Sequence, residues 1–280
     1  MPTIAERRQT FRDLHRSGCF AIPNPWDIGS ARYLQHLGFK AIATTSAGFA
    51  FSRGLPDGAL GRDMMLDHIR EIVEATDLPV NADFENGYAD EVGEVARNVR
   101  LCIETGVAGL SIEDNSGRKD RPLYDVELAV ERIRAAREAI GDSGTLLVAR
   151  AECFLVGVTN IDEVIRRLAA YANAGADCLY APGIRDREHI SAVVAAVAPK
   201  PVNLLIGGAV GLTMSDAAAL GVRRVSVGGA LARAAWGGFM CAARQLAEDG
   251  RFASFKDAAP HDELQEFFRD DAKRHKHSGN

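Results

Sequence analysis

The sequence lacks paired cysteines and long hydrophobic runs. Its five cysteines are scattered and form no C-x-x-C pair, which argues against a disulfide framework or a zinc site and favours buried thiols in a reducing compartment. No stretch approaches the roughly 18–20 apolar residues of a membrane-spanning helix. The N-terminal segment carries charges throughout and has no apolar core of signal-peptide length. These absences predict a cytoplasmic protein with no membrane partner.

An excess of positive charge is also missing. Lysine and arginine number 33 against 38 aspartates and glutamates, and the net charge is −5. This balance offers no basic surface for nucleic acid. The hydrophobic content of 47% is ordinary for a globular protein, and 280 residues suffice for a large core without disulfides.

What the sequence does contain is a recurring unit of apolar run, polar turn and amphipathic stretch, repeated about eight times. The expected strands cover residues 19–23, 41–45, 79–83, 108–114, 145–152, 177–182, 201–205 and 224–229. The expected helices cover residues 27–38, 62–76, 91–105, 126–140, 161–174, 187–198, 213–220 and 230–249. The apolar runs are nearly continuous, as in strands of a parallel sheet covered by helices.

This alternation predicts the fold class α/β, with a single (β/α)8 barrel over residues 1–250. An open doubly wound sheet is the alternative, but no G-x-G-x-x-G motif follows the first strand. Residues 251–280 are expected to form a helical extension with a frayed tail. A short helix there would carry Leu264, Phe267 and Phe268 on one face, docked on its own barrel or on a neighbouring subunit.

Acidic side chains gather where the third and fourth strands are expected to end. In barrels of this kind the chemistry lies at the carboxyl ends of the strands. Asp83, Glu85, Glu113 and Asp114 would repel one another there unless a cation lay between them. Carboxylate oxygens suit Mg²⁺, with Mn²⁺ as an alternative. The other interpretations are acid–base carboxylates or solvated caps.

Arg150 lies inside the apolar stretch LLVARAE, where an unpaired cation would be costly. Its guanidinium is suited to a carboxylate or phosphonate, and a structural ion pair is the alternative. The backbone of Ser46, Ala47 and Gly48 offers N–H groups to an oxyanion. A metal, an arginine and such amides together suit an α-oxo acid whose keto oxygen gains charge as an enolate forms.

These residues lie in stretches that resemble the isocitrate lyase / phosphoenolpyruvate mutase superfamily. The stretches run from about residue 24 to 230, in the order NPWDIGSARYLQHLGFKAIATTSAG, GLPDG, PVNADFENGYAD, GVAGLSIED, LLVAR, YAPG and PVNLL. The resemblance implies a (β/α)8 barrel whose last helix is swapped between subunits of a homo-dimer or homo-tetramer. It also implies Mg²⁺ and an α-oxocarboxylate substrate or enolate.

The resemblance further assigns roles to individual residues. The metal-shell positions are Asp57, Asp83 and Glu113. The substrate positions are Trp26 and Asp27, the segment Ser46, Ala47 and Gly48, and the gripping arginine, Arg150. Asp27 and Ser46 are equally well explained as caps of a helix and a turn.

Two stretches depart from the family pattern. The usual D-A-D of the third strand is Asn81-Ala82-Asp83, so one acidic ligand is lost, and Glu85 is expected to replace it. The loop at residues 115–125 has neither the cysteine nor the histidine of the family's lyases, and the mutase's longer gating loop is missing. Cleavage of isocitrate or methylisocitrate and phosphoryl migration are therefore not expected.

The sequence thus predicts a Mg²⁺-dependent carbon–carbon lyase or decarboxylase acting on a small α-oxo or α-hydroxy di-acid. Arg150, Glu113 and Asp57 are the expected catalytic residues, Asp83, Glu85, Glu113 and Asp57 the metal ligands, and Asn203 an orienting residue. The alternatives are a hydrolase or mutase of carbon–phosphorus bonds, as with phosphonopyruvate, and a non-catalytic oxo-acid-binding protein. Arg118, Lys119 and Arg121 either attract a second carboxylate or form a solvated loop.

Overall fold

The computed structural model describes residues 2–277, with side chains to residue 273. It contains two compact units, which among the described residues are 2–229 and 230–277. The last expected barrel helix therefore groups with the extension within one chain, and the predicted domain boundary at residue 250 stays a prediction. Across the described residues, the longest and most apolar helices still fall short of what a membrane span requires.

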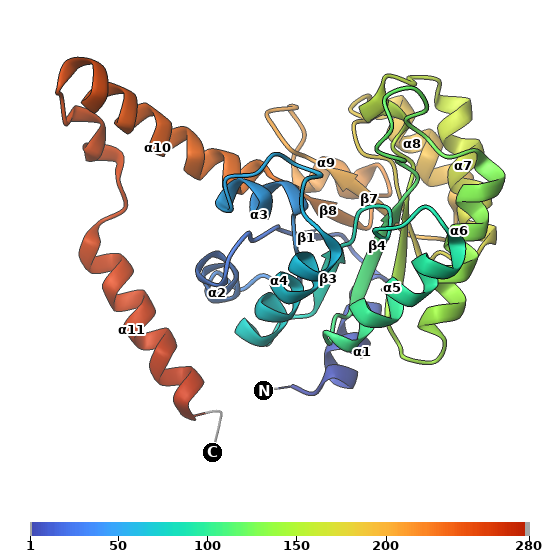
Figure 1. Ribbon diagram of the computed structural model, residues 1–280, viewed down its shortest axis with the longest axis horizontal. Coiled ribbons are helices and arrows are strands. Elements are labelled where there is room, and N and C mark those ends of the chain that lie inside the picture. The colour runs from blue at the N-terminus through green and yellow to red at the C-terminus, as the bar shows by residue number, and fades with distance from the viewer. Residues whose placement is uncertain (1, 278–280) are drawn as a thin grey trace. The chain divides into compact units, whose positions relative to one another are not determined.

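Eight parallel strands form the centre of the first unit, in the order β1-β8-β7-β6-β5-β4-β3-β2 (Figure 1). They are β1 (Phe20–Ile22), β2 (Ile42–Ala43), β3 (Val80–Asp83), β4 (Gly109–Glu113), β5 (Leu146–Arg150), β6 (Cys178–Tyr180), β7 (Val202–Leu205) and β8 (Arg224–Ser226). Asn24 helps to close the barrel, because its amide donates to the Thr44 carbonyl at 2.9 Å and accepts from the Gly228 N–H at 2.9 Å. The predicted (β/α)8 fold is confirmed.

Helices follow the strands and cover the outside of the barrel (Figure 1). They are α2 (Ile28–His36), α3 (Ser46–Ser52), α4 (Arg62–Ala75), α5 (Val92–Glu104), α6 (Val126–Ile140), α7 (Ile161–Asn173), α8 (Arg187–Val197) and α9 (Met214–Ala219), with a short 3-10 turn η1 (Cys153–Val156). The predicted helices are all present and end within about two residues of their expected limits. The short helix α3 was not predicted.

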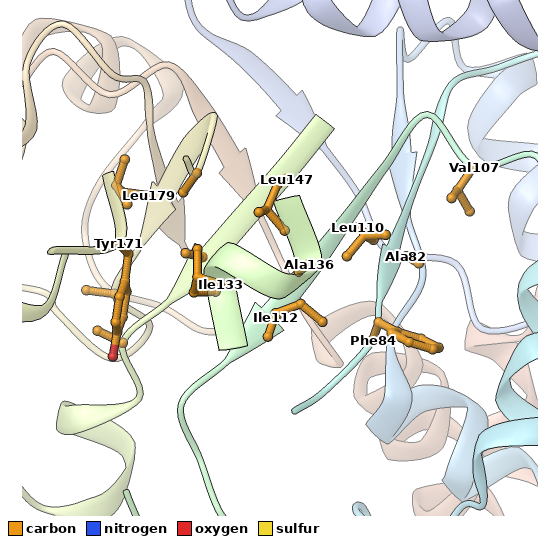
Figure 2. Close-up of a cluster of buried hydrophobic side chains, with 14 of the residues drawn as sticks. Ala82, Phe84, Val107, Leu110, Ile112, Ile133, Ala136, Leu147, Tyr171 and Leu179 are labelled. Atoms are coloured by element: carbon orange, nitrogen blue, oxygen red, sulfur yellow. The ribbon is translucent and has the colours of Figure 1, made fainter. Parts of the chain in front are cut away.

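Side chains alternate along each strand between the helices and the barrel interior. Ala82 and Phe84 are fully buried and pack with the outer helices, so Asn81 and Asp83 face the interior. Figure 2 shows the buried cluster between strands and helices, including Ile112 of β4 and Ile133 of α6. Full burial of such a side chain contributes about 1.5–3 kcal/mol.

A helix that sequence analysis missed, α1 (Ile4–Leu14), fills the amino-terminal end of the barrel. Its one buried residue, Phe11, packs with interior side chains such as Val148. Gly109 makes room for it, because a Cβ at that position would lie 2.6 Å from Phe11 Cε1. With Phe11 as its one buried residue and Leu14 partly buried beside the same cluster, the helix shows too little hydrophobic periodicity to be recognised from sequence.

The second unit contains α10 (Ala230–Asp249), a 3-10 turn η2 (Ala253–Asp257) and α11 (His261–His277). Large apolar side chains of α10 are exposed in the single chain: Leu231, Trp236, Phe239, Met240 and Leu246. On α11, Phe267 is buried whereas Leu264 and Phe268 are exposed. The swap of a helix between subunits stays a prediction.

The cysteines are all free thiols, as the sequence predicts. Cys102, Cys153 and Cys178 are buried and Cys19 is half-buried. Cys241 is exposed, so the prediction of buried thiols is wrong at that position.

Candidate active site

Arg150 lies at the carboxyl end of β5 and binds three carboxylates. Its Nη1 is 2.6 Å from Asp83 Oδ1, its Nη2 is 3.0 Å from Glu113 Oε2, and its Nε is 2.9 Å from Glu152 Oε1. The Arg150 side chain is 13% exposed. Burial disfavours its charge, but the surrounding carboxylates outweigh that effect and raise its pKa further. Arg150 is therefore a permanent cation at the centre of the site.

Ser46 connects two more acidic residues to this cluster. Its backbone N–H donates to Asp83 Oδ2 at 3.1 Å, and its hydroxyl lies 3.1 Å from Asp57 Oδ1 and 3.2 Å from Asp83 Oδ2. A hydroxyl has one proton, so it donates to one carboxylate at a time. Thr44 fixes Asp83 from the other side, since its hydroxyl accepts the Asp83 N–H at 2.9 Å. These contacts place Asp57 beside Asp83.

Glu85 carries a buried carboxylate oxygen, Oε1, that has no hydrogen-bond partner. The residue has a φ of 45°, a conformation that is unusual for a non-glycine residue. Its carbonyl accepts the Glu113 N–H at 2.9 Å, which connects the turn after β3 to β4. Burial, together with repulsion from Asp83 and Asp57, raises the pKa of Glu85 to about 7.

Negative charge exceeds positive charge across the whole cluster. Burial is the main cause of raised pKa values at Asp57, Glu113 and Glu152 as well.

Within the described part of the chain, no three acidic, histidine or cysteine side chains already stand in a metal-binding arrangement. Arg150 instead occupies the space between Asp83 and Glu113. The donor chemistry nevertheless fits a hard divalent cation, because the donors are carboxylate oxygens and Glu85 Oε1 is unpartnered.

Two cavities open around these residues and share Ser46, Asp57 and Arg150 as walls. The smaller cavity, of about 180 Å³, also contacts Thr44, Ala47, Asp83, Tyr180, Arg224 and Ser226. The larger, of about 600 Å³, extends over Glu85, Tyr88, Glu113, Asn115, Glu152 and Leu155. Both belong to the barrel unit and lie at the carboxyl ends of its strands, where the sequence predicts the site.

The predicted oxyanion segment is only in part available. The Ser46 N–H is held by Asp83, and the Gly48 N–H donates to Thr45 Oγ1 at 3.2 Å. Ala47 lines the smaller cavity, and these contacts leave its N–H unengaged. The segment opens α3, with Thr45 as its N-cap.

Three predicted substrate residues lie outside the walls of both cavities. Asp27 is exposed and caps α2, accepting the Ser30 N–H at 2.7 Å. Its neighbour Trp26 is half-buried. Asn203 is fully buried, donates to Ser226 Oγ at 3.0 Å and accepts from Arg224 at 2.7 Å. Roles of these residues in substrate binding stay predictions.

Asp114 does not join the carboxylate cluster, so its predicted place there is wrong. Its Oδ2 accepts hydrogen bonds from Arg167 at 3.0 Å and Tyr171 at 2.6 Å on α7. It follows Glu113 directly, and successive strand residues point to opposite faces. Glu152 lies against Arg150 in its stead, and its place two residues after Arg150 at a strand end was the available signal.

The loop after β4 forms a short hairpin in which Asn115 bridges Leu123. Arg118 pairs with Asp120 at 3.1 Å and Arg121 pairs with Asp125, all four being exposed. These contacts favour the solvated-loop interpretation of the basic residues. Sequence analysis also overlooked Arg224, the second of two consecutive arginines and the first residue of β8.

Comparison with known proteins addresses the family directly. A family model described as phosphoenolpyruvate phosphomutase matches residues 11–247. The chain belongs to this family. The predicted membership of the isocitrate lyase / phosphoenolpyruvate mutase superfamily, and with it the prediction of an enzyme of this lyase and mutase type, is confirmed.

Similarity extends to proteins of stated activity. A proposed lyase/mutase from Burkholderia cenocepacia J2315 is 50% identical, with a TM-score of 0.92 over 95% of this chain and 97% of that one. An oxaloacetate decarboxylase of Pseudomonas putida GB-1 is 36% identical over 194 residues, or 66% of each chain. A phosphonopyruvate hydrolase complexed with oxalate and Mg²⁺ is 26% identical, with a TM-score of 0.84 over 98% of both chains.

Proposed function

We propose that the protein is a divalent-metal-dependent carbon–carbon lyase or decarboxylase that acts on a small α-oxo or α-hydroxy di-acid through a pyruvate-like enolate. One observation carries the proposal: Arg150, Ser46 and the carboxylates of Asp57, Asp83 and Glu113 converge around two adjoining cavities. The family is shown, and an oxaloacetate decarboxylase is among its similar members. Cytoplasmic location and a homo-dimeric or homo-tetrameric state belong to the same proposal.

Asp83, Glu85 and Glu113, with Asp57 beside them, would hold Mg²⁺ or Mn²⁺. A bound divalent ion polarises a keto oxygen and stabilises the enolate that follows bond cleavage. Glu85 Oε1 is buried and has no hydrogen-bond partner, so it is the donor that a bound cation would stabilise most. The neutral Asn81, by contrast, accepts from Arg224 at 3.3 Å in the barrel interior, which gives it no place in this ligand set.

Arg150 would bind the substrate carboxylate through its two terminal nitrogens. Its N–H groups donate to Asp83 and Glu113, which are the proposed metal ligands, so these donors would be available to a substrate if the two carboxylates held a metal. Ser46 and Ala47 both line the smaller cavity, and the Ser46 hydroxyl and the Ala47 N–H would be suited to an oxygen that gains negative charge. With no cysteine or histidine in the loop at 115–125, the returning proton comes from water.

Turnover of oxaloacetate with and without EDTA tests the proposal. We expect pyruvate formation in Mg²⁺, its loss in EDTA and its recovery when Mg²⁺ is restored. Asp83→Ala should abolish turnover, whereas Asp120→Ala, in the exposed loop, should leave it unchanged. Turnover that ignores the chelator would contradict the metal role, and a folded protein inert toward a panel of oxo acids would contradict catalysis.

Cleavage of a carbon–phosphorus bond is the second candidate. Similarity to a phosphonopyruvate hydrolase over 98% of both chains favours it. Release of inorganic phosphate from phosphonopyruvate, measured beside pyruvate formation from oxaloacetate, separates the two activities. Tight oxalate binding without turnover of either compound would support the non-catalytic interpretation.

A further inference from the structure

Arg224, at the start of β8, is a buried cation in the wall of the smaller cavity. Its residue is 2% exposed. Its Nε–H donates to Asn203 Oδ1 at 2.7 Å, and its Nη1 lies 3.3 Å from Asn81 Oδ1 and 3.5 Å from His15 Nε2. The two amide oxygens are neutral acceptors, so the balance of charge depends on the state of His15.

His15 is a neutral partner too. Its Nδ1 lies 2.7 Å from the Phe11 carbonyl, which only accepts, so Nδ1 carries the proton. Burial, with the charge of Arg224 beside it, lowers the pKa of His15 to about 3. Nε2 is therefore unprotonated and accepts from Arg224.

Within residues 2–277, Arg224 has no carboxylate partner. Arg150, in the wall of the same cavity, has three. A buried cation with neutral partners is costly unless an anion joins it. The hydrogen bonds of Arg224 use Nε and Nη1, which leaves the two N–H groups of Nη2 uncommitted.

The neutral side chain of Asn81 leaves a net positive charge around Arg224. An aspartate at position 81 would put a carboxylate within about 3.3 Å of Arg224 and neutralise it. The Asn81 amide supplies an acceptor of the same shape without the negative charge. The positive charge of Arg224 is therefore available to an anion that enters the cavity. Other cavity walls here, Ser111 and Ser226, are small and polar.

We propose that Arg224 forms an anion-binding subsite at the deep end of the smaller cavity, which holds the second carboxylate of a small di-acid. Arg224 begins β8, whereas Ser46 and Gly228 lie beyond the carboxyl ends of their strands, so the di-acid would extend inward from Arg150. A volume of about 180 Å³ suits an acid of a few carbon atoms. This inference rests on the proposed function for the identity of the first carboxylate site.

Calorimetry on the full chain tests the subsite without reference to turnover. The probes are malonate and succinate as di-acids and acetate as the monocarboxylate. Of malonate and succinate, we expect the wild-type protein to bind the tighter-binding one at least tenfold more tightly than acetate. Arg224→Met should remove that preference and leave acetate affinity within about twofold, whereas Arg223→Met, on the neighbouring residue, should change neither.

Asn81→Asp provides an independent variant that keeps Arg224 and supplies an internal anion. It should also lower di-acid affinity at least tenfold, and circular dichroism establishes that each variant is folded. A di-acid preference that survives in a folded Arg224→Met or Asn81→Asp protein would overturn the inference, as would equal loss of acetate and di-acid. If the protein turns over no acid but still binds di-acids through Arg224, the proposed function is refuted. The inference of an anion-binding subsite is then still supported.

Discussion

Arg150 Nη1 and Asp83 Oδ1 lie 2.6 Å apart in the wall of the smaller cavity. The residues come from β5 and β3, on either side of Glu113 of β4, which pairs with Arg150 in the sheet register. In this ion pair, the guanidinium of Arg150 and the carboxylate of Asp83 neutralise each other's charge. Replacement of this pair by a metal–carboxylate contact and an arginine–substrate contact is the rearrangement that our account requires.

Arg150→Lys should lower kcat/KM for the preferred acid by at least about 100-fold. Lysine keeps the charge but loses the planar pair of donors that a carboxylate requires. Steady-state kinetics measures the effect. Arg187→Lys is the matched control, since Arg187 pairs with Asp216 on the protein surface and should tolerate the change. Equal activity of the Arg150 variant and the control would contradict a substrate role for Arg150.

Metal affinity should depend on pH through Glu85. Folding raises the pKa of Glu85 from 4.5 to about 7, so the folded protein holds this proton more tightly than the unfolded chain. The contribution of Glu85 to the free energy of unfolding therefore falls as pH rises from 4.5 toward 7 and levels off above it. Because a ligand must be ionised, Mg²⁺ affinity should rise with pH and flatten above 7.

Isothermal calorimetry from pH 5.5 to 8 measures this dependence. Glu85→Gln should weaken Mg²⁺ binding and flatten the profile, since the amide does not titrate in this range. Exposed Glu104 provides the control, and Glu104→Gln should reproduce the wild-type profile. A profile that keeps its slope without Glu85 would assign the titration to another group.

Gly109→Ala should destabilise the barrel by about 1–3 kcal/mol, the usual cost of overpacking a core. The new methyl group would meet the Phe11 ring of α1 and the Asn81 side chain, with Cβ distances of 2.6 and 2.9 Å. Urea denaturation measures the change. At Gly208 a Cβ meets nothing within 4 Å, so Gly208→Ala should be close to neutral. Equal stability of both variants would mean that α1 does not fill the barrel end tightly.

The exposed face of α10 should be an interface between subunits. Trp236 and Phe239 lie in edge-to-face contact, with ring centroids 5.3 Å apart, and both are exposed in the single chain. Trp236→Asp combined with Phe239→Asp should convert a dimer or tetramer into monomers in light scattering. Arg244→Asp, on the same helix, should leave the mass unchanged. A wild-type protein that is already monomeric would contradict the predicted helix swap.

The repeated apolar pattern was sufficient to predict the barrel and its longer covering helices, because each unit buries one continuous face. It was insufficient for α1 and α3, which are short or have few apolar contacts. Within the site, the polar residues collected at the strand ends include Arg150 and Asp83, which lie 2.6 Å apart, and their catalytic and metal-binding roles stay predictions. Asp114 was misplaced because adjacent residues in a strand face opposite sides, a distinction that depends on where the strand ends.

Glu152 and Arg224 were not assigned to the site from the sequence for a related reason. Their roles depend on which interior side chains meet across the barrel, and that is a property of tilt and register. Arg224 shows the point most clearly, since its partners Asn203, Asn81 and His15 come from three separate segments.

Titration with Mn²⁺, followed by electron paramagnetic resonance in the presence and absence of oxalate, tests the central claim most directly. The account predicts one bound Mn²⁺ per chain, tighter binding with oxalate, and loss of the bound signal in Asp83→Asn. A folded wild-type protein that leaves millimolar Mn²⁺ free, with or without oxalate, would contradict it.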